Sequence, residues 1–462
     1  MSDREILRPQ DRPNIGTWIP LSFQHVFAMF GATVLVPLIV IQAGVGIDPA
    51  TALFTAGTGT LIFIICTGAK VPAFLGSSFS FIAPLIVVST SPIYGLSYAL
   101  GAAMVTGLFY CVIALIVRFT GTGWLDKVLP PVVIGSVIVV IGLFLAPTAM
   151  SMASQMSVPN EEKLALLNLP EEGLAMLPAG YLDAMPDDVN QYSLVYLSIA
   201  IVTLGITIIA NIFFKGFFSA IPVLIGLISG YLFTFIMGLF FDAYAIIDFN
   251  VVKEADWFGF PKFHKPSFSL IPILIFIIVS FATICEHLGD MVVTSKIVGQ
   301  DFYKNPGLHR TLTGDGLASA WAALWGGPPN TTYSENVGVM AITRVYSVWV
   351  IGGAAVIAVL LAFFKKFGAV IQTIPSPVLG GVSILLFGII ASSGLRTIVE
   401  SGVDFKDKRN LIITSVILVI GIGGGKLAFN ITQDLHFELA GIALATLVGI
   451  ILNLVIPVTK KE

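Results

Sequence analysis

Charged residues are scarce in this chain of 462 residues: Lys, Arg, Asp and Glu together make up only 11% of it. Soluble domains contain about 25% charged residues, because their surfaces must be solvated. Hydrophobic residues reach 56%, so the shortage of charge excludes an ordinary soluble enzyme and indicates a protein that lies largely in lipid. The net charge of -3 provides no basic field for nucleic acid, and no nucleic-acid partner is expected.

Cysteines and cofactor motifs are also scarce. The three cysteines, Cys66, Cys111 and Cys285, each lie in an apolar run, so neither a disulfide framework nor a cysteine zinc site is expected. The glycine-rich stretch that ends at Lys426 lacks the spacing of a phosphate-binding loop. No nucleophile, metal cluster or cofactor motif supports an enzymatic activity, and no cofactor or metal is expected.

The chain instead contains many apolar runs, and twelve of them are long enough to cross about 30 Å of hydrocarbon. They lie near 17–41, 51–68, 94–117, 131–148, 192–214, 219–240, 268–286, 311–326, 346–364, 374–394, 410–424 and 438–457. Two further segments, 73–89 and 331–344, are interrupted by Gly, Ser, Thr, Pro or Asn. Counting both, the sequence predicts an all-α polytopic membrane protein with fourteen transmembrane segments.

The distribution of basic residues predicts the orientation. If all fourteen segments cross and the N-terminus lies inside, most of the 24 Lys and Arg residues fall on the cytoplasmic side. The polar first 16 residues lack the apolar stretch of a signal peptide and are expected to form a cytoplasmic tail. A long acidic joint, at about 149–191, then lies outside. We expect a multi-pass protein of the bacterial cytoplasmic membrane.

An internal repeat predicts the architecture. Pro131-Val-Val-Ile-Gly135 recurs as Pro377-Val-Leu-Gly-Gly381, and Gln24-His25 in the first segment has a counterpart in Glu286-His287 in the eighth. The two interrupted segments are the third and the tenth. Because seven segments per half is an odd number, the second half must be inverted, and the substrate site of such a 7+7 repeat is expected near the bilayer midplane.

The two interrupted segments favour extended backbone followed by a helix start, at Gly76-Ser77-Ser78 and again before about Glu335. Extended backbone at membrane depth is tolerated only where it is buried in protein or lines a cavity. Two facing helix N-termini would present free N–H groups to the oxygens of a ligand. The alternative is a pair of re-entrant loops that only close off the bundle.

Acidic residues in apolar surroundings are the candidates for the chemistry. Glu286 ends a long apolar run, where a carboxylate costs roughly 2.5 to 3.5 kcal/mol, so we expect it to face a cavity. Asp290 lies one helical turn later, close enough to share or pass on a proton. Alternatively, Glu286 lies near the interface and pairs with His287 or a nearby Lys. Asp315 is either a site residue or a helix-start residue near the interface, and His25 is either a site residue or a polar contact within the bundle.

The segment Glu335-Asn-Val-Gly-Val-Met-Ala-Ile-Thr-Arg344 matches the signature [QEP]-N-x-G-x-x-x-x-T-[RKG], so the chain resembles the nucleobase-ascorbate transporter (nucleobase:cation symporter-2) family. Gln24-His25 resembles the first-span motif of that family, and Pro329 to Ser347 resembles its bacterial uracil permease branch. The resemblance implies proton symport, an elevator-like mechanism and a homodimer formed through gate domains. It implies a core domain at 17–120 and 268–366 and a gate domain at 121–267 and 367–462.

The resemblance also implies a binding site for uracil, whose two N–H groups suit carboxylates and whose two carbonyls suit helix N-termini. The implied substrate-binding residues are Glu286, Glu335, Phe79, Ser334, Tyr333 and Ala32. The implied proton-coupling residues are Glu286, Asp290 and His25. The backbone N–H groups of Phe79 and Ser334 would reach the carbonyls of the base.

Three departures from the pattern of that branch keep alternatives open. Asp290 stands where the branch has His and where xanthine and urate carriers tend to have Asp, so a purine proton symporter is the main alternative. Phe387 replaces a Tyr, and Ser334 replaces a Gly. An anion exchanger or a channel on the same fold is a further alternative, but two buried acids facing the substrate would repel an anion.

Overall fold

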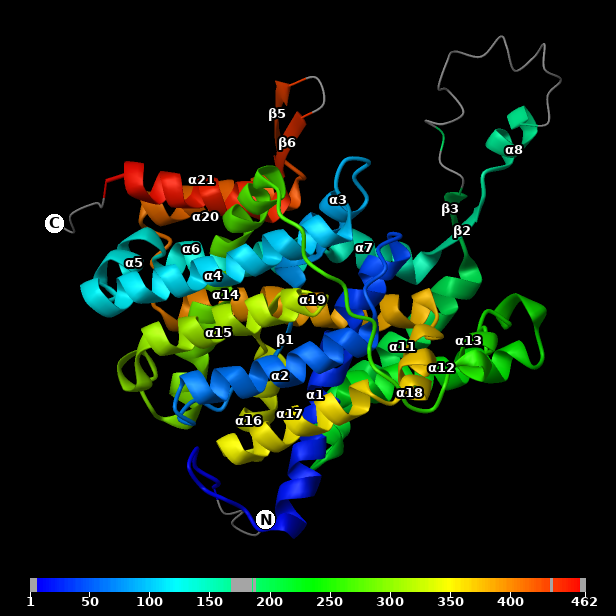
Figure 1. The fold of residues 1–462 in the computed structure, drawn as a ribbon, viewed down its shortest axis with the longest axis horizontal. Helices are drawn as coiled ribbons and strands as arrows, with labels where there is room; N and C mark the ends of the chain where they lie inside the picture. The colour runs from blue at the N-terminus through cyan, green and yellow to red at the C-terminus, as the bar shows by residue number, and fades with distance from the viewer. Residues whose placement is uncertain (1–5, 168–184, 186–187, 433–434, 458–462) are drawn as a thin grey trace.

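The computed structural model describes residues 6–167, 185, 188–432 and 435–457. Most of these residues lie in helices, and many of the long helices run side by side across the molecule (Figure 1). Large apolar side chains point outward, such as Ile65, Phe119 and Phe213, which are 77%, 78% and 69% exposed. Apolar surface of this extent suits lipid rather than water, and the prediction of an all-α polytopic membrane protein is confirmed.

The elements follow the segments that the sequence predicted. The first half contains α1 (Ile15–Gln42), α2 (Pro49–Cys66), β1 (Leu75–Ser77), η1 (Phe79–Phe81), α3 (Ile82–Ser89), α4 (Leu96–Thr120), α5 (Gly123–Val128), α6 (Pro131–Phe144), α7 (Ala146–Ser154), β2 (Gln155–Pro159), α8 (Glu161–Leu167), β3 (Asp188–Tyr192), α11 (Leu194–Phe213), η2 (Phe218–Ala220), α12 (Pro222–Gly238), η3 (Asp242–Tyr244) and α13 (Asn250–Glu254). The second half contains α14 (Leu270–Val298), η4 (Tyr303–Gly307), α15 (Leu308–Leu324), β4 (Asn330–Thr332), α16 (Ser334–Thr343), α17 (Val348–Ala362), α18 (Lys365–Gln372), α19 (Ser376–Glu400), α20 (Lys408–Ile422), β5 (Lys426–Thr432), β6 (Leu435–Ala440) and α21 (Gly441–Val455).

Among the described residues, seven helical stretches are long and apolar enough to cross a membrane. They are α1, α2, α4, α6 with α7, α11, α14 and α19. Helices α17 and α18 pass the same test together, but the chain bends by 85° between them. Every predicted segment coincides with a helix or with a strand followed by a helix. The count of fourteen crossings stays a prediction.

Helix α14 is longer than the sequence predicted. The predicted segment ended at Glu286, but α14 continues to Val298 and stops at Gly299, whose φ of +73° suits a helix C-terminus. The residues after the continuous apolar run still include buried Leu288 and Met291, which keep one face of the helix packed. Glu286 consequently lies in the middle of a buried helix.

The helices pack in two groups. Helix α15 packs against α2 and α4, and α17 packs against α1 and α2, whereas α19 packs against α6, α7 and α11, and α20 against α21. These groups follow the predicted core and gate ranges, whose division stays a prediction. One stretch of the predicted gate, just before α14, contacts the core helices: the N–H of Lys262 donates to Asp48 at 3.0 Å and that of Ser267 to the Ser97 carbonyl at 2.8 Å.

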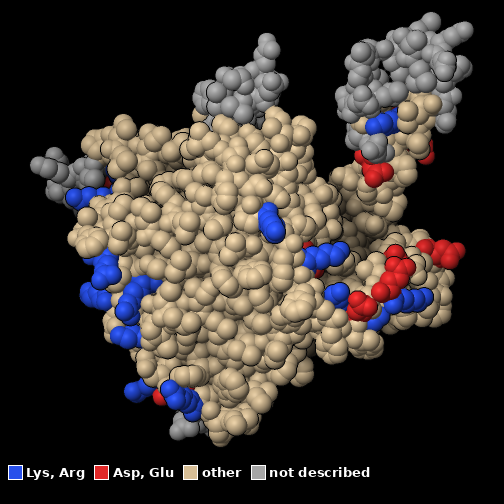
Figure 2. All heavy atoms as spheres, in the orientation of Figure 1, with Lys and Arg blue, Asp and Glu red and all other residues tan. Residues whose placement is uncertain are grey.

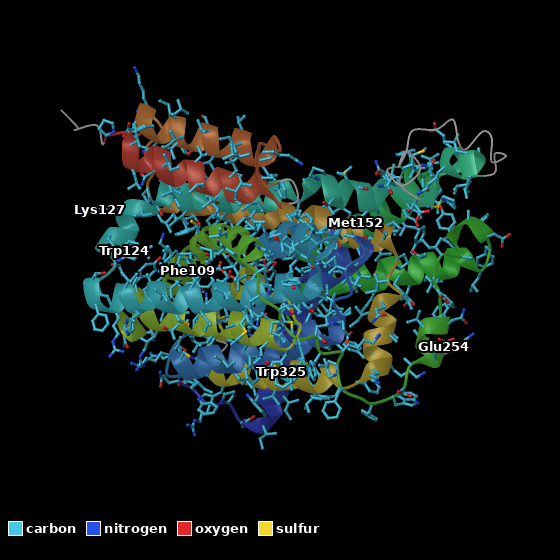
Figure 3. The ribbon with its side chains drawn as sticks, turned by 45° about the horizontal axis from the view of Figure 1, so that its top comes forward. Phe109, Trp124, Lys127, Met152, Glu254 and Trp325 are labelled. Atoms are coloured by element: carbon cyan, nitrogen blue, oxygen red, sulfur yellow. The ribbon has the colours of Figure 1, made fainter. Side chains whose placement is uncertain are left out.

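Charged side chains gather at two ends of the molecule. Lys and Arg predominate at the left end in Figure 2, around α5 and the adjoining ends of α4 and α15, whereas acidic side chains lie together with Lys and Arg at the opposite end near α13. Lys127 on α5 and Glu254 on α13 mark the two ends (Figure 3). The central part of the acidic joint, at 168–184 and 186–187, lies outside the described residues.

The N-terminal tail is tied to the loop that follows α16. Leu7 pairs with Val345 in a parallel bridge, and the N–H of Tyr346 donates to the Leu7 carbonyl at 2.7 Å. The guanidinium of Arg12 lies over the ring of Trp349, 4.1 Å from its centroid. From its first described residues, the tail is therefore strapped to the end of α16.

Candidate functional site

A buried pair of short strands lies at the centre of the site. Strands β1 and β4 pair antiparallel, with Gly76 opposite Thr331. The pairing continues on both sides, because the N–H of Ser78 donates to the Pro329 carbonyl at 2.8 Å and the N–H of Tyr333 donates to the Phe74 carbonyl at 3.0 Å. All residues of both strands are buried. This pairing satisfies the backbone of both interrupted segments at membrane depth.

Each strand leads directly into a helix. Ser78 and Tyr333 hold extended backbone (φ -76°, ψ 127° and φ -106°, ψ 115°), and η1 with α3 begins after the first and α16 after the second. In the part of the chain that the structure describes, no side chain caps either helix start. The first backbone N–H groups of a helix have no partner within it. Both N-termini can therefore donate hydrogen bonds to a ligand and favour its partially negative atoms.

A small pocket lies between these helix starts and the neighbouring helices. Its walls come from η1, α6, α14, the β4–α16 junction and α19, and are formed by Phe79, Ile138, Glu286, Asp290, Tyr333, Ser334, Glu335, Ile390 and Ser393. The cavity measures about 10 Å³, roughly the space of one water molecule. It combines carboxylates, helix N-termini and an aromatic ring in a setting closed to bulk water, which suits a small flat polar molecule once the walls separate.

Two of the three carboxylates of this pocket, Asp290 and Glu286, differ in their hydrogen-bond partners. Asp290 is 4% exposed and accepts hydrogen bonds from two hydroxyls, that of Thr332 at 2.8 Å and that of Ser334. Glu286 is 9% exposed and accepts one long bond, from the Ser80 hydroxyl at 3.5 Å. Asp290 thus fastens α14 to the start of α16, whereas Glu286 keeps most of its hydrogen-bonding capacity for a ligand or a proton.

Two aromatic residues shape the pocket. The rings of Phe79 and Phe387 meet edge to face with centroids 5.6 Å apart, so the Phe that replaces a Tyr of the uracil branch packs against a wall of the pocket. The Tyr333 hydroxyl donates to the Ser77 carbonyl at 3.1 Å, and its ring crosses over Gly76. A Cβ on Gly76 would lie 2.4 Å from that ring, so only glycine fits there.

His25 and Ala32 are buried in α1 but do not line the pocket. Instead, the Nδ2 of Asn336 lies 3.2 Å from His25 Nδ1 and donates to the His25 carbonyl at 3.3 Å. Because Asn336 directly follows Glu335, this contact fixes α16 against α1. The structure therefore brings together six of the eight residues expected at the site and places His25 behind them.

A second buried polar cluster lies on the same helix as Glu286. His287 Nδ1 is 3.3 Å from Asp315 Oδ2 and His287 Nε2 is 3.0 Å from the Thr311 hydroxyl, with His287 and Asp315 fully buried. Of the alternatives left open by the sequence, an interfacial Glu286 paired with His287 is wrong, since His287 turns to Asp315. An interfacial Asp315 is wrong as well, because Asp315 lies mid-helix in α15.

Several pocket residues escaped the sequence analysis. Ile138, Ile390 and Ser393 come from α6 and α19, where apolar and small residues recur along the whole helix and only packing selects the ones that face the site. Thr332 and Ser80 adjoin the predicted residues, and their hydroxyls acquire a role only through contact with α14.

In the described part of the chain, no group of three or more His, Cys, Asp or Glu side chains could hold a metal ion.

A larger cavity of about 310 Å³ adjoins the small pocket and shares Asp290, Ser334 and Ser393 with it. It extends along α14, α16 and α19 to Ile297 and Arg396. Near its far end the Lys296 ammonium on α14 lies 3.1 Å from a Glu400 oxygen on α19. The small pocket is therefore approached from the end of the molecule that carries these charges.

Comparison with known sequences gives matches over nearly the whole chain. A profile of the Permease family (Xan_ur_permease) matches residues 16–182 and 173–428. The uracil permease of Bacillus subtilis (strain 168) is 48% identical over 469 residues, which cover 100% of this chain and 98% of that protein. The uracil permease of Escherichia coli (strain K12) is 43% identical over 452 residues, which cover 98% of this chain and 94% of that protein.

Comparison with solved structures gives a related fold. The transmembrane domain of the cyanobacterium bicarbonate transporter BicA superposes with a TM-score of 0.62 and covers 97% of this chain and 100% of that domain. The sequence identity is 16%, so this likeness concerns the fold alone.

Proposed function

Because the chain belongs to the Permease family of nucleobase:cation symporters, in its uracil permease branch, and is a transporter rather than an enzyme, we propose that it imports uracil together with protons across the cytoplasmic membrane. The observation that carries the proposal is the pocket in which two helix N-termini and the carboxylates Glu286 and Glu335 converge on one small space.

Uracil complements this pocket group by group. Its two N–H donors are matched by the acceptors Glu286 and Glu335, and its two carbonyls by the N–H groups of Phe79 and Ser334. The ring of Phe79 supplies an apolar face for the base. The Tyr333 ring lies against Gly76 at the edge of the pocket. Ala32, expected near the base, is buried in α1 and does not line the pocket in this conformation.

Proton coupling is assigned to Glu286. Asp290 is already held by two hydroxyls, so it is expected to keep α14 and α16 in place. Glu286 has a single long bond and faces the substrate space. A carboxyl group in this position must be neutral or paired for the carrier to move through the membrane at low cost. The His25–Asn336 contact would orient α16 during this step.

We further propose an elevator-like movement, which is supported by the way the pocket is divided. One wall belongs to η1, α14 and α16 of the proposed core domain, and the other to α6 and α19 of the proposed gate domain. A cavity of about 10 Å³ is too small for a base, so the two domains must separate for substrate to bind. With the N-terminus inside, the larger cavity at Arg396 opens to the cytoplasm.

We also propose a homodimer through the gate domains, whose α11 and α12 expose apolar side chains such as Ile212 and Leu232.

The test is uptake of labelled uracil into proteoliposomes with an imposed inward proton gradient. Accumulation that a protonophore abolishes and that excess xanthine leaves unchanged is the expected result. A purine symporter is the second candidate, because Asp290 stands where xanthine and urate carriers tend to have Asp. Strong competition by xanthine, or no uracil uptake, would favour that candidate and reject uracil as the substrate.

A further inference from the structure

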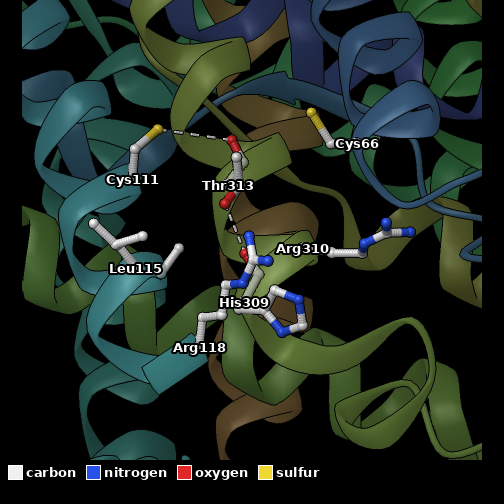
Figure 4. A pocket seen from close by; sticks show the side chains of 8 residues that line it. Cys66, Cys111, Leu115, Arg118, His309, Arg310 and Thr313 are labelled. Atoms are coloured by element: carbon white, nitrogen blue, oxygen red, sulfur yellow. Dashed lines mark hydrogen bonds between the residues drawn. The ribbon is translucent and has the colours of Figure 1, made fainter. Parts of the chain in front are cut away.

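A second crevice lies away from the substrate pocket, where three helices of the first group have their ends. It measures about 480 Å³, a size typical of ligand sites. Cys66 is the last residue of α2, Arg118 lies in the last turn of α4, and His309 and Arg310 lie in the first turn of α15. Figure 4 shows these side chains around the crevice, with the sulfurs of Cys66 and Cys111 toward the top of the view and Arg118 and His309 toward the bottom.

The charge of this crevice is positive and uncompensated. No acidic residue lines it. In the part of the chain that the structure describes, neither Arg118 nor Arg310 forms an ion pair or a side-chain hydrogen bond. Both side chains are exposed. Two unpaired guanidinium groups beside one cavity form a site for an anion.

Apart from Thr313, the remainder of the crevice lining is apolar or carries a thiol. Ala114 and Leu115 on α4 form one wall, and Cys66 on α2 contributes to another. Leu115 is 53% exposed and, one turn away along α4, Phe119 is 78% exposed. These outward-facing apolar residues continue from the crevice onto the lipid-facing surface of α4. A ligand that fills the whole crevice therefore needs a negative head and an apolar body.

We propose that this crevice binds one anionic phospholipid, with the negative headgroup at the basic end lined by Arg118, His309 and Arg310 and an acyl chain along Leu115 and Phe119. Basic pockets between transmembrane helices are suited to anionic headgroups, and the arginine fork matches phosphate oxygens. The apolar wall selects a lipid over inorganic phosphate, which would leave that wall without a partner. The proposal concerns the membrane partner of the first helix group and does not depend on which base the protein carries.

The test measures lipid binding to the purified full-length protein by native mass spectrometry, with phosphatidylglycerol or phosphatidylcholine added to delipidated protein in detergent. Each basic residue near an anionic headgroup contributes about 1 kcal/mol, so Arg118→Gln with Arg310→Gln should weaken phosphatidylglycerol binding about 30-fold. Arg118→Lys with Arg310→Lys should retain most of it. Lys406→Gln with Lys408→Gln removes the same charge from the start of α20 and the residues just before it, and should change little.

A second measurement uses the natural cysteines and needs no variant. Cys66 and Cys111 line the crevice and are partly exposed, whereas Cys285 is fully buried. Bound phosphatidylglycerol should slow alkylation of Cys66 by a maleimide, and phosphatidylcholine or inorganic phosphate should not. Equal protection by phosphate, equal retention of lipid by the double Gln variant, or equal loss in the Lys406/Lys408 control would each overturn the proposal. Uracil uptake in the same preparations is scored separately, so failure of the transport proposal would remain distinguishable.

Discussion

The two strand–helix junctions have the same backbone and different chemistry. β1 leads into η1 and α3, β4 leads into α16, and the strands pair antiparallel with each other. The first junction brings only neutral side chains to the pocket side, namely Phe79 and Ser80, whereas the second brings Glu335 and the hydroxyl of Ser334. The inverted repeat thus supplies the N–H donors twice but supplies carboxylates from one half only.

The helices that support these junctions show the same asymmetry. On α14, Glu286 and Asp290 face the pocket, while the repeat-related Gln24-His25 on α1 is neutral, and His25 contacts Asn336 behind the pocket. We therefore propose different roles for the two halves. The first half contacts the base through neutral groups, whereas the second half binds the base and supplies the carboxylates. Substitutions at Glu286, Glu335 and Ser80 test this difference in roles, and a substitution at Gly76 tests the scaffold that both halves share.

The largest effect is expected for Glu286→Gln, which removes the titratable group but keeps the size of the side chain. Proton-driven accumulation of uracil should fall at least about 100-fold, while exchange of uracil across the membrane at equal pH should persist. The measurement is uptake into proteoliposomes with and without an imposed proton gradient. Normal accumulation by this variant would remove Glu286 from the coupling step.

Glu335→Ala should have the next largest effect, since it leaves an N–H group of the bound base without a partner. Hydrogen bonds to charged groups contribute about 1.5 to 3 kcal/mol, which corresponds to roughly 10- to 150-fold weaker uracil binding. Calorimetric titration of the purified variant measures this directly. An unchanged dissociation constant would mean that the second junction does not contact the base through its carboxylate.

Gly76→Ala tests the scaffold that both junctions share. The added Cβ would lie 2.4 Å from the Tyr333 ring, and such overpacking costs about 1 to 3 kcal/mol of stability. Gly338→Ala is the matched control, because nothing lies within 4 Å of a Cβ at that position on α16. Thermal unfolding in detergent should show a lower Tm for the first variant only; equal Tm values would show that the ring can move aside.

Ser80→Ala should have the smallest effect, because its bond to Glu286 is 3.5 Å long. Neutral hydrogen bonds contribute about 1 kcal/mol, so uracil binding should weaken by no more than about fivefold. If Ser80→Ala weakened uracil binding as much as Glu335→Ala in the same titration, the first junction would contribute as much to binding as the second. That result would contradict the proposed difference in roles.

Much of the fold could be predicted from the sequence, because apolar run length directly determines what can cross a membrane. The positions of the segments and the two interrupted segments rest on such local signals. The grouping of Phe79, Glu286 and Glu335 around one pocket was expected from the resemblance to the transporter family. The continuation of α14 past Glu286 was missed because the apolar run stops there, although Leu288 keeps one face of the helix packed.

What the sequence could not supply is the set of contacts between distant segments. Thr332 is one of many threonines, and only its contact with Asp290 across 42 positions gives it a role. Ile390 resembles every other isoleucine of α19 until packing turns it toward the pocket. The β5–β6 hairpin was also missed, because its first strand directly follows α20 and its last residues join the apolar run of α21.

The strap between the N-terminal tail and the end of α16 has a practical consequence. Because the Leu7 N–H donates to the Arg344 carbonyl and the Leu7 carbonyl accepts from the Tyr346 N–H, we expect the tail to move together with α16. Ile6 is 50% exposed, so a fluorophore there, paired with an acceptor dye on an outward-facing position of α12, would convert the relative motion of the two helix groups into an optical signal while leaving the substrate pocket free of labels.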